Sequence, residues 1–171
     1  MSKKNIAVLG AGKMGLGIAQ LFATKGHQVK VIYVYDDKIR CDAAAVVRSN
    51  LSVLVENDVM TQQEADDAAA RISFVDTIEE VADFADIVFE GIIEKLEIKQ
   101  DYFAKMDAIF PVSTILATNT SAISITEIAE KSVHKERIIG THYWNPAYLV
   151  PLVEVIKTKY VSDETVQATY D

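Results

Sequence analysis

The sequence predicts an α/β fold, a doubly wound and mostly parallel sheet with helices on both faces and a helical excursion after the second strand. Short apolar runs alternate with amphipathic helical patterns along the whole chain. Most of these runs are continuously apolar, which is typical of strands that are buried on both faces of a parallel sheet. A glycine-rich turn joins the first strand to the first helix.

The N-terminal part of the chain is predicted to form a strand, a helix and a second strand. Residues 6–9 are an apolar run, and a helical pattern extends over residues 14–24, with Gly26 at its end. A β-branched and aromatic run follows at residues 29–35. This succession within about 30 residues is a βαβ unit.

The helical excursion is predicted over residues 38–70. Apolar residues recur every four positions from 38 to 56, which predicts one face of a long helix. Asn57 and Asp58 interrupt this pattern. Thr61 and Glu64 then form a capping-box pattern that predicts a second helix through residue 70.

The alternation of strands and helices resumes after the excursion. Strands are predicted at 72–75, 87–89, 114–117, 138–140 and 152–156, and helices at 77–84, at 94–106 and after Ser124. Ser162 and Asp163 predict the start of one more helix. Residues 1–171 are long enough for one domain of ordinary size, and we assign them to a single dinucleotide-binding domain.

Composition excludes several classes of protein. The 17 basic and 25 acidic residues give a net charge of −8, which argues against nucleic acid or an anionic membrane as the main partner. The single cysteine, Cys41, excludes an internal disulfide framework and a multi-cysteine metal site, and we expect no metal. No apolar run is long enough for a signal peptide or a membrane span, so we expect a cytoplasmic protein.

The glycine-rich turn has the G-x-G-x-x-G pattern. Gly10 would permit the tight turn, Gly12 would let the backbone approach a pyrophosphate, and Gly15 would let helix and strand pack closely. The start of the following helix offers amides and positive potential to phosphates. The pattern therefore predicts a dinucleotide site, the alternative being a glycine-rich turn that binds nothing.

An acidic residue follows the second strand at the spacing expected for ribose binding. Asp36 lies 21 residues after Gly15, close to the roughly 20 residues expected of the acid that binds the adenosine ribose. A carboxylate there accepts hydrogen bonds from both ribose hydroxyls and repels a 2′-phosphate, so NAD is favoured over NADP. In the alternative interpretation, Asp36 only caps the long helix.

Polar residues also follow the later strands. Asn119 and Ser121 come after the strand at 114–117, and His142 comes after the strand at 138–140. Glu154 lies inside an apolar run and needs a partner, for which His142, twelve residues earlier, is suitably placed. Function gathers at the carboxyl ends of strands in such sheets.

Four spaced motifs carry a family resemblance. They are G-A-G-x-M-G-x-G-I-A at 10–19, E-x-x-x-E-x-x-x-x-K at 90–99, N-T-S at 119–121, and G-x-H-x-x-N-P at 140–146 with L-V-E-V at 152–155. With them the chain resembles the NAD-binding, N-terminal domain of the 3-hydroxyacyl-CoA dehydrogenase family. The resemblance implies a Rossmann-like fold and the cofactor NAD. The family's C-terminal helical domain has no counterpart in these 171 residues.

The resemblance also implies catalytic roles. His142 would be the general base for a substrate 3-hydroxyl while hydride leaves C3 for the nicotinamide. Glu154 would hold the imidazole tautomer and favour its charged form. Ser121 would donate a hydrogen bond to the substrate oxygen, and Asn145 would position substrate and nicotinamide. The plainer alternatives are a structural histidine at 142 and a turn residue at 121.

The implied cofactor-binding residues are Gly10, Gly12, Met14, Gly15, Asp36, Glu94 and Lys99. An ordinary exposed pair on a helix is the alternative for Glu94 and Lys99. In the family, the ribose acid comes about four residues after the first valine of the second strand, which here is Tyr33. The acids follow three residues later, so the choice between Asp36 and Asp37 stays open.

The resemblance leads to one main functional hypothesis, an NAD-dependent oxidoreductase of acyl-CoA metabolism that converts L-3-hydroxyacyl-CoA to 3-ketoacyl-CoA. The excursion, which helps to hold coenzyme A in the family, offers only Arg48 as a basic residue between 41 and 58. Residues 147–151 resemble relatives that act on free hydroxy acids such as carnitine or gulonate.

Two alternatives therefore stay open. They are a dehydrogenase of a free small 3-hydroxy acid and a lone NAD-binding module without turnover. We expect the full-length family member to be a homodimer and this chain to be a fragment or truncated product that binds NAD but does not catalyse alone.

Overall fold

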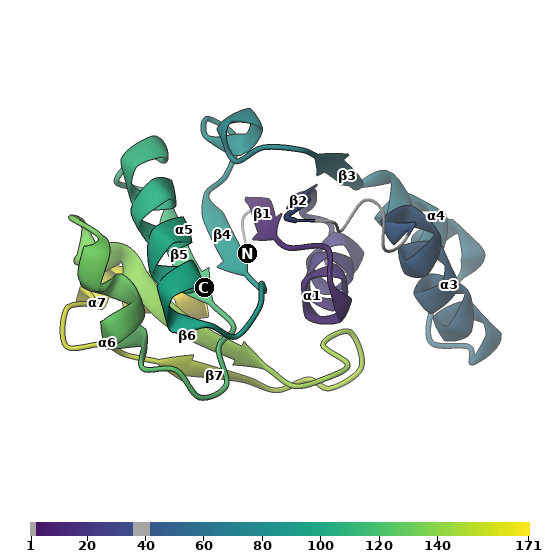
Figure 1. The fold of residues 1–171 in the computed structure, drawn as a ribbon. Helices are drawn as coiled ribbons and strands as arrows, with labels where there is room; N and C mark the ends of the chain where they lie inside the picture. Colours follow the sequence, from purple (N-terminus) through teal and green to yellow (C-terminus); the bar gives the residue numbers. More distant parts are fainter. Residues whose placement is uncertain (1–2, 36–41) are drawn as a thin grey trace.

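The computed structural model describes residues 3–35 and 42–171, which form a seven-stranded sheet with helices on both faces (Figure 1). The strands are β1 (Asn5–Leu9), β2 (Gln28–Ile32), β3 (Ile72–Val75), β4 (Ile87–Glu90), β5 (Ile115–Thr118), β6 (Ile138–Tyr143) and β7 (Val153–Ile156). The helices are α1 (Lys13–Thr24), α3 (Ala43–Glu56), α4 (Gln62–Ala70), α5 (Leu96–Ile109), α6 (Ile125–Ile128) and α7 (Asp163–Tyr170). Short 3-10 helices are η1 (Glu79–Val81), η2 (Ala129–Lys131) and η3 (Lys135–Arg137).

The strand order, β3-β2-β1-β4-β5-β6-β7, confirms the predicted doubly wound, Rossmann-like sheet. Every pair from β3 through β6 is parallel, and only β6 and β7 are antiparallel. The order reverses between β1 and β4, so the loops that follow these two strands leave the sheet side by side. Ligands bind at such a switch point in open α/β sheets.

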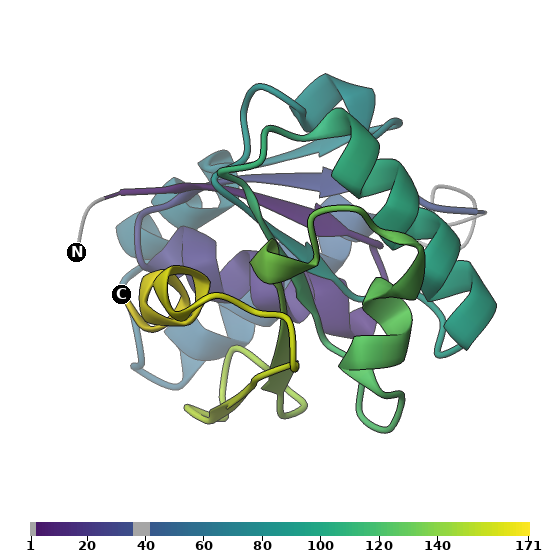
Figure 2. The same ribbon diagram turned by 90° about the vertical axis from the view of Figure 1, so that its left-hand side faces the viewer.

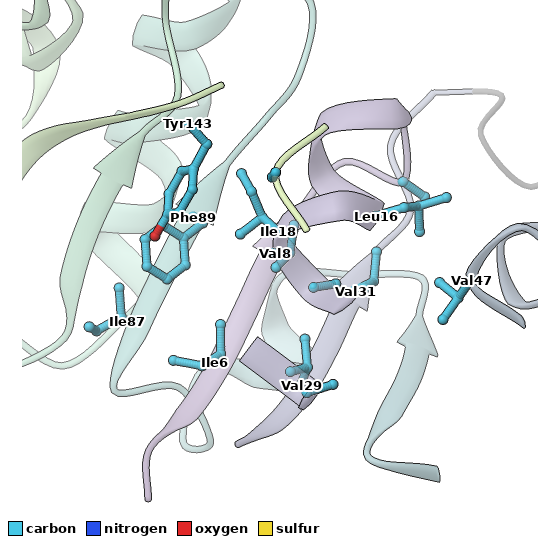
Figure 3. Close-up of a cluster of buried hydrophobic side chains, with 14 of the residues drawn as sticks. Ile6, Val8, Leu16, Ile18, Val29, Val31, Val47, Ile87, Phe89 and Tyr143 are labelled. Atoms are coloured by element: carbon cyan, nitrogen blue, oxygen red, sulfur yellow. The ribbon is translucent and has the colours of Figure 1, made fainter. Parts of the chain in front are cut away.

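The sheet is buried on both faces because its strands contribute side chains to two hydrophobic clusters. In β1, Ile6 and Val8 belong to the cluster under α1, α3 and α4, whereas Ala7 and Leu9 belong to the cluster under α5 and α6. Figure 3 shows the first cluster, with Phe89 beside Tyr143. Two-sided burial is the reason why the central strands are mostly apolar.

The excursion packs on α1. The side chain of Asp42 caps α3 by accepting a hydrogen bond from the amide of Ala45 (3.0 Å), and the predicted capping box of Thr61 and Glu64 opens α4. Asp42 is the N-cap of α3, and Asp36, for which a capping role is the alternative, lies outside the described residues. Helix α7, drawn in yellow in Figure 2, contributes Val166 to the same hydrophobic cluster that lies under α1.

Several predicted elements differ from the structure. Helix α3 begins at Ala43 instead of residue 38, and β6 continues through Tyr143, so His142 lies inside the strand and not after it. The predicted helix at 77–84 is only the 3-10 turn η1, because the carboxylate of Glu80 accepts hydrogen bonds from the amides of Asp76 and Thr77 and closes a tight turn. The strand predicted at 29–35 ends at Ile32, and Tyr35 adopts a φ of 50°, which turns the chain away from the sheet. No helix of the described residues is long and apolar enough to span a membrane.

A buried ion pair ties α5 to the start of β6. The guanidinium of Arg137 donates to Asp107 Oδ1 at 2.7 and 3.1 Å, and Asp107 Oδ2 accepts from the amides of Val133 and His134. Burial by itself raises the pKa of Asp107, but the hydrogen bonds from Arg137 and the two amides outweigh it and hold the pKa below its usual value. The pair thereby fixes the strand that carries His142.

Replacing Arg137 with methionine should lower the free energy of unfolding by about 3–5 kcal/mol, since it leaves Asp107 buried without its partner. Urea titration measures this loss. Lys131→Met, which breaks the solvent-exposed pair with Asp101, is the control and should cost less than about 1 kcal/mol.

The deficit of Arg137→Met should also depend on pH. Because the folded pKa of Asp107 is depressed, its contribution is present above the unfolded pKa of about 3.9 and is lost as pH falls through the lower folded value. The difference between the two proteins should therefore shrink below about pH 4. A difference that stays constant there would contradict the assignment to this carboxylate.

Candidate active site

The glycine turn has the geometry that its sequence pattern predicts. Gly10 has a φ of 105°, which favours glycine, and its amide donates to the carbonyl of Ile32 at 3.0 Å. A Cβ on Gly15 would lie 2.0 Å from the carbonyl oxygen of Gly10, so the helix could not approach β1 with a larger residue there. Met14 packs against the cluster under α1.

Gly12 differs from the other two glycines because a Cβ built on it meets no atom of the described residues within 4 Å. Packing therefore does not require glycine at this position. Gly12 is also the N-cap of α1 and has no side chain to bind the first amides of the helix. An open backbone beside uncapped amides fits the pyrophosphate of a dinucleotide.

The residue that directly follows β2 is Tyr33. Its amide continues the ladder by donating to the carbonyl of Val75 at 2.9 Å, and its ring stacks on Phe74 with 5.6 Å between ring centroids. Asp36 and Asp37 lie outside the described residues, so the assignment of the ribose acid remains a prediction.

Three side chains from three parts of the chain meet beyond the carboxyl end of β5. Glu154 of β7 stands opposite His142 of β6 in the antiparallel register, and its Oε2 lies 2.6 Å from Nδ1 of the imidazole. On the other side of the ring, Oγ of Ser121 lies 3.0 Å from Nε2. The twelve-residue spacing of His142 and Glu154 is therefore that of two paired strands and their connection.

This arrangement assigns the protons of the imidazole. A carboxylate can only accept, so Nδ1 of His142 carries the proton toward Glu154, and Nε2 is left as the base. The Ser121 hydroxyl donates to that nitrogen. The side chain of His142 is about one fifth exposed and that of Glu154 about half exposed, so the base is accessible from solvent.

Asn145 is not part of this triad. Its side chain is exposed in the loop that follows β6, and within the described part of the chain it makes no hydrogen bond to Ser121, His142 or Glu154. A different asparagine is fixed beside the triad. Oδ1 of Asn119 accepts from the amide of Tyr143 at 2.8 Å, so Asn119 holds the residue next to His142. The N-T-S motif was the signal for it.

Glu94 and Lys99 do not form an exposed helix pair, and that alternative is wrong. Glu94 precedes α5, and the side chain of Lys99 is 1% exposed because its ammonium lies 2.6 Å from Glu90 and 3.2 Å from Glu94. Glu90, at the end of β4, is a residue of the site that the sequence interpretation passed over. Its signal was an acid ending a wholly apolar strand, which requires a buried partner.

Glu94 is ionised. Burial raises its pKa, but the hydrogen bonds from Thr120 and Ser121 together with the charge of Lys99 outweigh burial and lower the pKa below the usual value.

In the described part of the chain, no group of three or more His, Cys, Asp or Glu side chains gathers as a metal site would.

Comparison with known proteins agrees with this geometry. The model of the 3-hydroxyacyl-CoA dehydrogenase NAD binding domain matches residues 5–171. The chain belongs to this family. Its cofactor is NAD, and the observations at Gly12 and at the start of α1 fit that cofactor.

Among relatives, a probable 3-hydroxybutyryl-CoA dehydrogenase of Bacillus subtilis is 41% identical over 167 residues, which are 96% of this chain and 57% of the relative. The crystal structure of the (S)-3-hydroxybutyryl-CoA dehydrogenase of Ralstonia eutropha superposes with a TM-score of 0.91 at 33% identity, over 98% of this chain and 59% of that one. A diketoreductase that acts on dicarbonyl compounds superposes with a TM-score of 0.90 at 25% identity, over 99% and 60%. The chain thus spans little more than half the length of these proteins.

Gly12→Ala should weaken NADH binding at least about tenfold, since the added methyl group occupies the space of the pyrophosphate. The free energy of unfolding should change by less than about 1 kcal/mol, because the methyl group meets no described protein atom. Calorimetric titration with NADH and urea unfolding measure the two effects. Gly15→Ala is the contrasting variant and should destabilise the fold. Unchanged NADH affinity in Gly12→Ala would contradict the assignment of the turn.

Proposed function

We propose that this chain binds NAD and supplies the proton-transferring residues for the oxidation of L-3-hydroxyacyl-CoA to 3-ketoacyl-CoA. The observation that carries the proposal is the hydrogen-bonded series Ser121–His142–Glu154, built at the carboxyl edge of a sheet whose glycine turn fits a dinucleotide. A base held by a carboxylate and facing a hydroxyl donor suits removal of a proton from an alcohol.

The reaction breaks one C–H and one O–H bond of the substrate. The hydride and the proton go to different acceptors. NAD, when bound, would supply the acceptor for the hydride of C3. Nε2 of His142 takes the proton of the 3-hydroxyl, and the carboxylate of Glu154 stabilises the imidazolium that results. Ser121, which donates to Nε2 in the structure, would donate instead to the substrate oxygen as the ketone forms.

The remaining predicted residues take their places around this centre. Gly10, Gly12, Met14 and Gly15 would hold the pyrophosphate side of NAD, and Asp36 stays the proposed acid for the ribose. The side chain of Glu94 is 42% exposed and can face the cofactor, whereas Lys99 is buried and would contribute through Glu94. Asn145, exposed after β6, would reach substrate and nicotinamide only in the complex.

A second candidate is a dehydrogenase of a small carbonyl or 3-hydroxy compound without coenzyme A. Arg48 on α3 is the only basic residue of the excursion between 41 and 58, which leaves few groups to neutralise the phosphates of coenzyme A. The likeness to a diketoreductase supports the same reading, since that enzyme's described substrates are dicarbonyl compounds.

Several properties of the whole protein follow from the family assignment as proposals. The relatives are nearly twice as long as this chain, and we propose that residues 1–171 form the NAD-binding domain beside a C-terminal helical domain. We further propose a homodimer through that second domain, a small-molecule substrate as the main partner and a cytoplasmic location.

The choice of substrate can be tested with the full-length protein that contains this chain, by following NADH oxidation with acetoacetyl-CoA and with free acetoacetate, beside a calorimetric titration with NADH. We expect NADH to bind and the thioester to be reduced faster than the free acid. Faster reduction of acetoacetate would favour the second candidate. NADH binding without turnover of either compound would favour a binding module.

In the active full-length protein, His142→Gln should lower turnover by about 10²–10⁴-fold, because the substrate hydroxyl loses its base. Affinity for NADH should stay within a few-fold, since the imidazole is proposed to act on the substrate hydroxyl and not to bind the cofactor. Stopped-flow turnover and calorimetry separate the two effects. Glu154→Gln is the companion variant and should lower turnover while leaving NADH affinity unchanged. Intact turnover with lost cofactor binding would reverse the assignment.

A further inference from the structure

A buried carboxylate lies beneath the site, and both of its oxygens accept hydrogen bonds. Oε1 of Glu90, a residue with 0% exposure, accepts from the ammonium of Lys99 at 2.6 Å and from the amide of Ile92 at 2.7 Å. Oε2 accepts from the hydroxyl of Thr118 at 2.6 Å, and Thr118 is the residue of β5 directly opposite Glu90 in the register. Glu90 therefore fixes Lys99 and the end of β5 together.

Lys99 connects this carboxylate to a second one. Its ammonium also contacts Oε2 of Glu94 at 3.2 Å. The other oxygen of Glu94 accepts from the hydroxyl of Thr120 and from the amides of Ser121 (3.1 Å) and Ala122 (3.4 Å). One charged oxygen thus holds three consecutive residues of the loop that follows β5.

The loop at 119–123 has a partner for every backbone amide. In order, the amides donate to the Glu90 carbonyl, Thr118 Oγ1, Glu94 Oε1, Glu94 Oε1 again and Thr120 Oγ1. Each of these acceptors belongs to Glu90 or Glu94 or to a threonine hydroxyl that bonds to one of their carboxylates. A loop bonded in this way has few alternative arrangements.

The loop presents one group to the imidazole. Ser121 Oγ lies 3.0 Å from Nε2 of His142, while Asn119, two residues earlier, accepts from the amide of Tyr143 beside that histidine. The loop is therefore held to β6 at two points. The direction of the Ser121 hydroxyl depends on the same bonds that hold its amide.

We propose that Glu90, Lys99 and Glu94 are positioning residues that act on His142 through Ser121. They hold the loop so that the Ser121 hydroxyl points at Nε2, the nitrogen that takes the substrate proton under the proposed function, on which this inference rests. Lys99 contributes through Glu94 and needs no contact of its own with the cofactor. Donors held in place before the reaction cost no reorganisation during it.

The test uses the 171-residue chain and four variants. Glu94→Gln removes the charge that holds the loop, Ser121→Ala removes the transmitting hydroxyl, and the double variant combines them. Because Lys99→Met alone would leave Glu90 unpaired in the core, the lysine is tested as Glu90→Gln with Lys99→Met. Glu79→Gln is the matched control, since Glu79 pairs with Lys105 on the surface away from the loop.

Two NMR measurements report on the action of Glu90, Lys99 and Glu94 on His142 through Ser121, and neither requires turnover. Amide hydrogen exchange at Ser121 and Ala122 should be at least about tenfold faster in Glu94→Gln and several-fold faster in the Glu90→Gln, Lys99→Met variant. The ¹⁵N shift of His142 Nε2 should move in Glu94→Gln toward its value in Ser121→Ala. The Nε2 shift of the double variant should match that of Ser121→Ala alone, because the effects of two substitutions are not additive when one residue acts through the other. Glu79→Gln should change neither measurement.

Any one of three results would overturn the inference. Faster exchange with an unchanged Nε2 shift would show that the loop is held but does not act on His142. If Glu94→Gln changed the Nε2 shift by the same amount in the Ser121→Ala background as in the unaltered chain, the charge of Glu94 would act on His142 directly. If amide exchange at Ser121 and Ala122 did not change in the Glu90→Gln, Lys99→Met variant, Glu90 and Lys99 would not help to position the loop. Absence of turnover would count against the proposed function and leave these measurements standing.

Discussion

Burial of the sheet on both faces is the constraint on which the rest of this structure depends. Because Ile6 and Val8 face one cluster and Ala7 and Leu9 the other, β1 has no side chain left for chemistry along its length. The polar groups of the site therefore gather toward the edge where the parallel strands end. The glycine turn after β1, Glu90 at the end of β4 and Ser121 after β5 all lie at that edge.

The antiparallel strand β7 makes the exception that the site requires. A parallel partner for β6 would need a crossover helix, whereas an antiparallel one returns within a short connection. That return places Glu154 directly opposite His142. Since β7 lies at the edge of the sheet, the pair stays accessible although the strand ends around it are buried.

Charge in the site is organised around carboxylates. Glu154 orients the imidazole, Glu90 binds Lys99 in the core, and Glu94 binds the loop that carries Ser121. Glu90 tolerates complete burial because Lys99, Thr118 and the Ile92 amide supply its bonds. The acidic residues of this site thus orient and hold other groups.

The glycine turn, the capped helices and the pairing of His142 with Glu154 could be predicted because each depends on local spacing. Residue types decide such features, as with Gly10, whose φ of 105° favours glycine. The burial of Lys99 could not be predicted, because helical spacing does not reveal which face of α5 meets Glu90 across the sheet. The prediction for residues 77–84 failed for a local reason, because Glu80 accepts from the amides of Asp76 and Thr77 and closes η1 by bonds that a helical apolar pattern does not reveal.

By itself the sequence determined the order of most elements, the turn that fits a dinucleotide and the pairing of His142 with Glu154. Tertiary structure alone decided that Asn119 lies beside the triad while Asn145 stays exposed, and that Glu90 joins β4, β5 and α5. The physical reason is the range of the interactions. Turns and caps form between residues close in sequence, whereas a buried charge finds its partner only after the sheet has brought distant strand ends together.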